Sequence, residues 1–139
     1  MEDLKKNLDR IKELTEELTI IPYFNEEIMS IFLEDSPIIS WIEDSDGRYV
    51  YANKACLTRF NITESILGKT DKDFFPLEVA ETFRANDLMV LERNEKIELR
   101  EDAPTPDGVM RKWFVIKFPM TLHKKSYVGG LAVDITNME

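Results

Sequence analysis

Residues 38–55 decide the fold, and they read IISWIEDSDGRYVYANKA. Two runs rich in β-branched and aromatic residues, 38–43 and 48–52, flank the tetrapeptide DSDG at residues 44–47. Because an Asp-Gly pair supplies the positive φ angle that a tight turn needs, we expect the two runs to form a hairpin. Asn53 follows the second run, and its side chain can cap a helix that begins at the next residue. This stretch therefore predicts a strand–turn–strand unit that leads directly into a helix.

The composition of the 139-residue chain is that of one globular domain with an extension. The net charge of −9 argues against nucleic acid and anionic membrane as partners, because both require clustered lysine and arginine. No stretch approaches the roughly 20 apolar residues of a membrane span, so we expect no membrane contact. A single cysteine, Cys56, excludes an internal disulfide bond and fits a reducing compartment, which predicts a cytoplasmic location.

An amphipathic helix is predicted for residues 2–19, within a first segment that comprises residues 1–21. Its apolar residues follow alternating steps of four and three, with Thr15 where the pattern lacks an apolar residue. This seam consists of Leu4, Leu8, Ile11 and Leu18. Two interpretations fit the seam: one side of a parallel coiled coil in a homodimer, or a helix that lies on its own domain. Pro22 is expected to end or kink the helix.

The rest of the chain separates strands from helices. A second helix is expected at 26–33, capped by Asn25, within a segment 22–37 that leads into the domain. After the hairpin we expect four helical segments, at 54–60, 63–67, 71–75 and 77–92. Three further strands are expected at 96–103, 110–118 and 127–135. The order β-β-α-α-α-α-β-β-β favours the α+β class, with a five-stranded antiparallel sheet and helices on one face.

Four sequence motifs, in this order, resemble those of the PAS domain, a small sensory module of bacterial signalling proteins. They are DSDGRYVYANKA at 44–55, GKTDKDFFP at 68–76, KFP at 117–119 and DIT at 134–136. The first resembles the opening hairpin of the family, and the next two resemble segments of one PAS subgroup. The last resembles the tripeptide that closes many PAS domains and leads into an output helix. The resemblance covers residues 31–136 and implies a PAS domain at 38–136.

The resemblance implies a sensory function within a larger protein. PAS domains of this subgroup occur in sensor histidine kinases of two-component systems, in diguanylate cyclases and in similar multidomain proteins. We therefore expect the domain to sense a small cytosolic ligand or the state of a partner. Residues 137–139 would begin the linker to a C-terminal effector, as in a piece cut from a longer protein. The alternative is a ligand-free module for dimerisation and protein interaction.

No catalytic arrangement and no metal site are expected in this chain. It has no phosphate-binding glycine loop and no nucleophile–base pair, and His123 falls in a predicted turn. No Cys/His cluster has the spacing of a zinc site, and Asp71, Asp73 and Glu78 are interpreted as charges at helix starts. Flavin-binding PAS domains carry their cysteine in an NCRFLQ segment, which is absent. Haem-binding PAS domains take a histidine from the long helix, and residues 77–100 contain none. We therefore expect neither flavin nor haem.

A cavity between the sheet and the helices is the candidate ligand site that the resemblance implies. The residues expected to line it are Trp41, Tyr51, Asn53, Phe60, Phe74, Phe83, Trp113 and Lys117. A pocket needs a few convergent polar groups among apolar walls, and Tyr51, Asn53 and Lys117 could supply them. The alternative is that the aromatic residues simply pack the core.

The DIT motif, Asp134, Ile135 and Thr136, is the candidate signal output. The resemblance implies that the Asp134 carboxylate takes a hydrogen bond or a basic partner near the end of the last strand. The Thr136 hydroxyl is expected to cap a helix that runs on through Asn137 and Met138. A small shift of the sheet would then be transmitted to an output helix.

Overall fold

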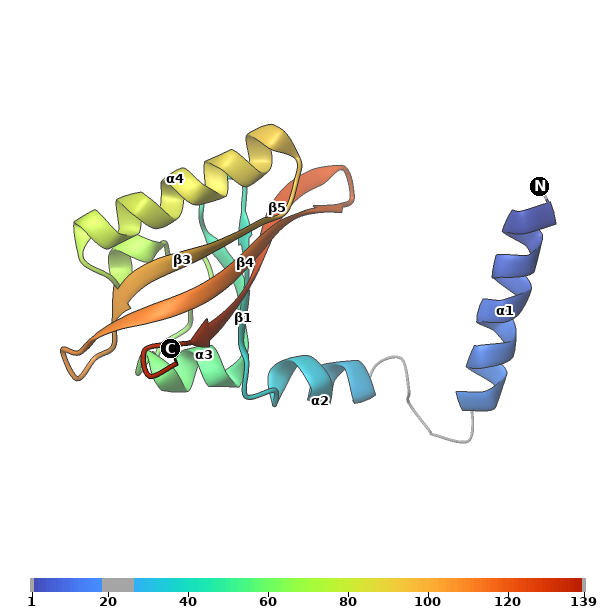
Figure 1. Cartoon of the computed structure of the whole chain (residues 1–139), viewed down its shortest axis with the longest axis horizontal. Helices are drawn as coiled ribbons and strands as arrows, with labels where there is room; N and C mark the ends of the chain where they lie inside the picture. The colour runs from blue at the N-terminus through green and yellow to red at the C-terminus, as the bar shows by residue number, and fades with distance from the viewer. Residues whose placement is uncertain (1, 19–26, 139) are drawn as a thin grey trace. The chain divides into compact units, whose positions relative to one another are not determined.

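The computed structural model describes residues 2–18 and 27–138, which fall into two compact units, Met1–Leu33 and Glu34–Glu139 (Figure 1). In the first unit, α1 (Glu2–Leu18) confirms the predicted N-terminal helix, and the acidic residues of its first turn suit the positive end of the helix dipole. Its seam residues Leu4, Leu8 and Ile11 are 57% to 59% exposed within the chain. The predicted helix end at Pro22, the cap Asn25, and the side chains of Thr15 and Leu18 lie outside the described residues. Helix α2 (Met29–Glu34) follows.

The second unit contains the predicted five-stranded antiparallel sheet. Its strands are β1 (Ile39–Asp44), β2 (Tyr49–Ala52), β3 (Ile97–Pro104), β4 (Met110–Leu122) and β5 (Lys125–Asp134). Their order across the sheet is β2-β1-β5-β4-β3, so the N-terminal hairpin pairs with the last strand. Every paired neighbour is antiparallel, which confirms the α+β class.

The helices of this unit are α3 (Lys54–Arg59), the 3₁₀ helix η2 (Asp71–Asp73) and α4 (Leu77–Arg93). Helix α4 packs against β3, β4 and β5, whereas α3 packs against β1 (Figure 1). The buried core lies between these helices and one face of the sheet, where Ile39, Trp113 and Val115 point inward. None of the helices in the described ranges combines the length and apolar character that crossing a membrane requires.

Asn53 confirms the predicted cap and fixes α3 to the sheet. Its side-chain oxygen accepts hydrogen bonds from the backbone N–H of Cys56 in α3, at 3.0 Å, and of Ser40 in β1, at 3.1 Å. Its amide nitrogen donates to the carbonyl of Ile38 at 2.7 Å. Gly47 takes the expected positive φ angle, +81°, in the turn between β1 and β2.

The predicted helical turn at 63–67 is wrong. The chain leaves helical geometry there because the next residues pair with the backbone of Tyr49. The N–H of Gly68 donates to the Tyr49 carbonyl, and the Tyr49 N–H donates to the Lys69 carbonyl. These bonds give the short edge strand β2 backbone partners on its outer side. Three helical segments, not the predicted four, therefore lie between β2 and β3.

The predicted turn at His123 is shorter than the strands expected at 110–118 and 127–135 implied, because β4 and β5 continue almost to the end of their hairpin. Only His123 and Lys124 connect them, with φ angles of +49° and +65°. Positive φ at both central residues matches the right-handed twist of paired strands, so a two-residue turn can close the hairpin.

Candidate ligand pocket

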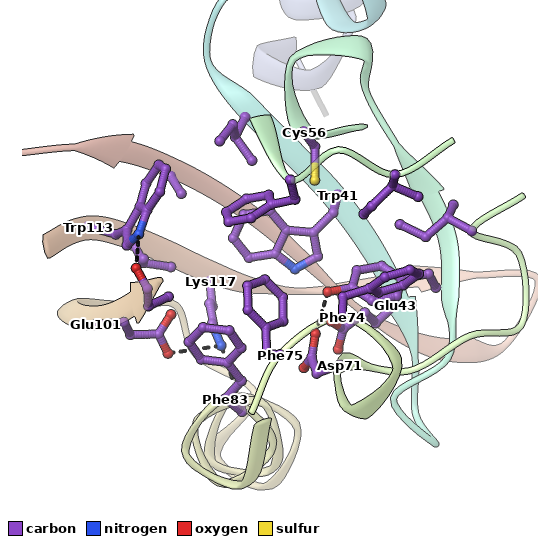
Figure 2. Close-up of a pocket in the computed structure, with 18 residues that line it drawn as sticks. Trp41, Glu43, Cys56, Asp71, Phe74, Phe75, Phe83, Glu101, Trp113 and Lys117 are labelled. Carbon is purple, nitrogen blue, oxygen red and sulfur yellow. Dashed lines mark hydrogen bonds and ion pairs between the residues drawn. The ribbon is translucent and has the colours of Figure 1, made fainter. Parts of the chain in front are cut away.

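A pocket lies between the helices and the inner face of the sheet, and its walls are mainly apolar and rich in aromatic side chains (Figure 2). The space open to the centre of a water-sized sphere is about 50 Å³. A single water needs roughly 10–15 Å³ on this measure, so the pocket has room for several waters or one small organic molecule. Among the predicted pocket residues, those that line it are Trp41, Phe60, Phe74, Phe83, Trp113 and Lys117.

The aromatic rings of the pocket contact one another through their edges. The Phe75 ring lies 5.1 Å from both Phe60 and Phe83 between ring centroids, in edge-to-face geometry. The rings of Trp41 and Phe75 occupy the middle of the pocket in Figure 2. Each such contact contributes about 0.5–1.5 kcal/mol beyond the burial of apolar surface. The packed rings therefore hold a fixed shape around the space that remains between them.

Tyr51 and Asn53 do not line the pocket. β2 carries a bulge: Ile42 pairs with Tyr51, but the next residue of β1, Glu43, pairs with Tyr49. The extra residue in β2 puts Tyr49 on the inner face with Glu43 and turns Tyr51 to the other face, because alternation along a strand restarts at a bulge. The Tyr51 hydroxyl donates to Glu34 at 2.9 Å. The side chain of Asn53 bonds to the backbone of β1 and α3 and is not directed at the pocket.

Lys117 is the positive centre of the pocket and is only 2% exposed. Its Nζ forms ion pairs with Oδ1 of Asp87 at 3.0 Å and with a Glu101 carboxylate oxygen at 3.2 Å. Nζ also donates to the Phe83 carbonyl at 3.3 Å. Burial alone lowers the pKa of Lys117, but the two carboxylates outweigh burial and raise it. The lysine therefore stays charged inside the domain.

Glu43 and Asp71 form the acidic side of the pocket. The Tyr49 hydroxyl donates a short hydrogen bond to Asp71, whereas Oε2 of Glu43 is buried without a hydrogen-bond partner. Burial, reinforced by the neighbouring carboxylates Asp71 and Asp87, raises the pKa of Glu43 to about 11. Burial likewise raises the pKa of Asp71 to about 6, although the Tyr49 hydrogen bond opposes the shift. Glu43 is thus a neutral carboxylic acid at pH 7.

Sequence reasoning placed Asp71 among helix-start charges and did not single out Glu43, Asp87 or Glu101. Asp73 does have the expected local role, because its carboxylate accepts the Thr70 N–H at 2.9 Å. Asp71 instead joins Glu43 and Asp87, with one carboxylate oxygen of each within 4.8 Å of the others. Three oxygens at this spacing are also a donor set for a hard cation, although Lys117 already lies against Asp87.

Cys56 also borders the pocket and is buried. Burial, with Asp71 and Glu43 nearby, raises the pKa of its thiol to about 12. The thiolate is the reactive form of cysteine, so Cys56 is a poor nucleophile in the folded domain.

Asp134, at the end of β5, has the basic partners that the DIT resemblance implied. Its Oδ2 lies 2.5 Å from Arg59 of α3 and 3.3 Å from Arg111 of β4. Burial raises the pKa of Asp134, but hydrogen bonds from Thr136 and Arg59 outweigh it and hold the pKa at about 2. The expected helix cap at Thr136 is wrong for the described residues: its hydroxyl accepts the Lys112 N–H and residues 136–137 form a turn.

The fold, the pocket and the DIT segment together define a sensory class of domain. The family model of the PAS fold matches residues 33–139, so the chain belongs to the PAS-fold family. A diguanylate cyclase of Vibrio cholerae is 28% identical in an alignment 137 positions long, which covers 94% of this chain and 40% of that protein. An uncharacterized protein y4lL of Sinorhizobium fredii is 28% identical in an alignment 105 positions long, which covers 72% of this chain and 12% of that protein. The chain thus spans less than half the length of both relatives.

Solved structures show the same fold at lower sequence identity. The PAS domain of an HTR-like protein from Haloarcula marismortui has a TM-score of 0.64 and 20% identity, over 94% of this chain and 99% of that one. VqmA of Vibrio cholerae, solved as a ligand–DNA complex, has a TM-score of 0.71 and 24% identity, over 79% of this chain and 51% of that one.

The VqmA structures correct the expectation that nucleic acid is excluded. A second structure describes a large conformational shift of the VqmA dimer in the absence of its target DNA. A protein that contains this fold therefore binds DNA. The exclusion was wrong because the net charge of −9 describes this stretch alone, and this fold accounts for only 51% of the VqmA chain.

Proposed function

We propose that this PAS domain binds a small ligand in the pocket and passes the binding event to an effector in a longer bacterial signalling protein. The observation that carries this is a pocket with aromatic walls and a group of buried charged residues. Buried charges cost stability unless they are paired, so four buried carboxyl groups beside one lysine are an expensive arrangement for a purely structural core. An apolar pocket with a few convergent polar groups is the usual form of a ligand site. The Vibrio cholerae relative supports a diguanylate cyclase as the effector. A cytoplasmic location and the absence of flavin and haem stay predictions, the last testable by visible absorption of the purified protein.

Filling the pocket is expected to abolish ligand binding. Ala103 lines the pocket and is buried, so Ala103→Leu places extra carbon atoms in the central space. Overpacking costs about 1–3 kcal/mol, which a domain of ordinary stability tolerates. Native mass spectrometry and a thermal-shift screen of metabolites would first identify a ligand for the wild-type domain. A ligand at 100 times its Kd stabilises by about 2.7 kcal/mol, and this gain should vanish in Ala103→Leu.

Ala85→Leu is the matched control, because the same change falls on the exposed side of α4. That variant should keep the full ligand-induced stabilisation. A ligand that stabilises Ala103→Leu as much as the wild type would bind elsewhere and would contradict the proposed pocket.

Asp134 is expected to couple the domain to its effector. It holds α3 and β4 together through Arg59 and Arg111 and lies at the last residue of β5. In the full-length protein, Asp134→Ala should lower the response of effector activity to ligand, and Asp102→Ala, an exposed change on β3, should not. A folded Asp134→Ala protein with a wild-type response would show that these ion pairs are only structural.

The N-terminal helix is expected to hold a homodimer. The seam residues Leu4 and Leu8 are exposed on α1, and an apolar stripe of this kind favours a helical partner. Leu8→Glu or deletion of residues 1–21 should give a monomer by light scattering, whereas Asn7→Glu, outside the seam, should remain dimeric. A deletion variant that stays dimeric would place the interface on the PAS domain itself.

A further inference from the structure

The polar side of the pocket has more hydrogen-bond acceptors than donors. Four carboxyl groups, those of Glu43, Asp71, Asp87 and Glu101, are buried around it. The donors that meet them are the ammonium group of Lys117, the hydroxyl of Tyr49 on Asp71, and the amide of Asn86 on Glu101 at 2.8 Å. Lys117 meets Oδ1 of Asp87, whereas Oε2 of Glu43 and Oδ2 of Asp87 have no donor. Buried acceptors without donors are costly, so these carboxyl groups need either a proton of their own or the donor group of a bound molecule.

The pocket also has fewer positive than negative groups. One ammonium group faces four carboxyl groups, all of them at least nine-tenths buried. Four carboxylates and one lysine would leave several uncompensated negative charges in a medium of low dielectric constant. Protons can neutralise them in the empty pocket, and a bound cation can do the same.

We propose that the polar side of the pocket takes the ammonium group of a small organic amine, with the Glu43 carboxylate as its acceptor. This inference rests on the proposed function and names the chemical class of the ligand. Glu43 lines the pocket, whereas Asp87 does not, so Glu43 presents the accessible acceptor. The apolar part of the amine would lie against Trp41, Phe74 and Phe75, whose ring faces also attract cations.

Anions and metal ions fit this site less well. The only buried cation among the described pocket residues, Lys117, is already held by Asp87 and Glu101, so a carboxylate ligand would face four carboxyl groups with no free positive partner. A divalent metal bound to Glu43, Asp71 and Asp87 would have to share Asp87 with an ammonium group 3.0 Å away. An ammonium group on the Glu43 side avoids both conflicts.

Three probes with one ring and different polar groups test the inference: benzylamine, benzyl alcohol and benzoate. Binding would be measured by calorimetry at pH 7.5 to the whole chain, to Glu43→Gln and to Glu92→Gln. The first variant resembles the protonated carboxyl group, so the fold should persist, and the second makes the same change at an exposed residue of α4. We expect benzylamine to bind the wild type and Glu92→Gln roughly tenfold or more tightly than benzyl alcohol, a preference lost in Glu43→Gln. Benzylamine binding should also release a proton from Glu43, detectable as a buffer-dependent enthalpy.

Each other result overturns the inference. Benzyl alcohol or benzoate binding at least as tightly as benzylamine would retain a ligand pocket but reject the amine class. An unchanged benzylamine affinity in Glu43→Gln, or binding without proton release, would reject Glu43 as the acceptor. Stabilisation by magnesium, calcium or manganese ions in place of benzylamine would identify a metal site. If no probe and no metabolite binds the wild type, the proposed function fails together with the inference.

Discussion

Replacement of Lys117 by methionine is expected to lower the free energy of unfolding by about 3–5 kcal/mol. The side chain is 2% exposed, and its ammonium group is held by Asp87 and Glu101, which are themselves buried. Methionine fills a similar volume but leaves both carboxylates without a counter-charge in the interior. Since natural domains are stable by only about 5–15 kcal/mol, the variant should be close to unfolding at physiological temperature. Urea denaturation, compared at equal m value, measures the change.

Two further variants separate lost charge from lost packing. Lys112→Met makes the same change at an exposed residue of β4 and should alter stability by no more than about 0.5 kcal/mol. Adding Glu101→Gln to Lys117→Met removes one of the orphaned negative charges, so the double variant should be more stable than Lys117→Met alone. A loss below 1 kcal/mol for Lys117→Met would mean that the carboxylates accept protons at no cost and that the lysine is not needed.

The parts of the fold that the sequence predicts well depend on residues close together in the chain. The Asp-Gly turn and the Asn53 cap need only neighbouring backbone groups, and both form as expected. The bulge in β2 is different, because it depends on how Tyr49 and Tyr51 pair with β1 and with residues 68–69. The sequence does not reveal this bulge, so Tyr51 was expected in the pocket and Tyr49 was given no polar role there.

The charged part of the pocket was only half predictable. Trp113, Val115 and Lys117 alternate along β4, so the sequence places the lysine on the buried face, and a buried lysine requires acidic partners. The chain offers 27 acidic residues, and those that converge here come from different elements: β1, η2, α4 and β3. Nothing in the local pattern distinguishes Asp87 on a helix of mixed polarity from its exposed neighbours. Only the tertiary packing selects them.

The domain is expected to lose stability as the pH rises from about 6 to 8, the reverse of ordinary acid denaturation. Burial raises the pKa of Glu43 from 4.5 to about 11, so between these values the folded chain keeps a proton that the unfolded chain releases. When the folded state binds more protons, the free energy of unfolding falls with rising pH, by at most about 1.4 kcal/mol per pH unit for one group. The raised pKa of Asp71, about 6, adds to this trend only below pH 6.

Other shifted groups do not cancel the trend between pH 6 and 8. The pKa of Asp134 is lowered to about 2, so its contribution is lost only in strong acid, and the raised pKa of Lys117 acts above its ordinary value of 10.5. Glu43→Gln carries no titrating proton. Its stability should be nearly constant over this range, whereas that of the wild type should fall by up to about 3 kcal/mol between pH 6 and 8.

Urea denaturation at half-unit steps from pH 5.5 to 8.5 measures this dependence, with Glu92→Gln as the exposed control that should keep the wild-type slope. The expected result is unusual because removal of an ionisable group stabilises the domain, and does so more as the pH rises. It follows from the position of Glu43 beside Asp71 and Asp87, where the ionised form has no donor to meet it. Parallel pH profiles for the wild type and Glu43→Gln would show that Glu43 ionises normally in the folded domain. The conclusion that its carboxylate lacks a donor would then be wrong.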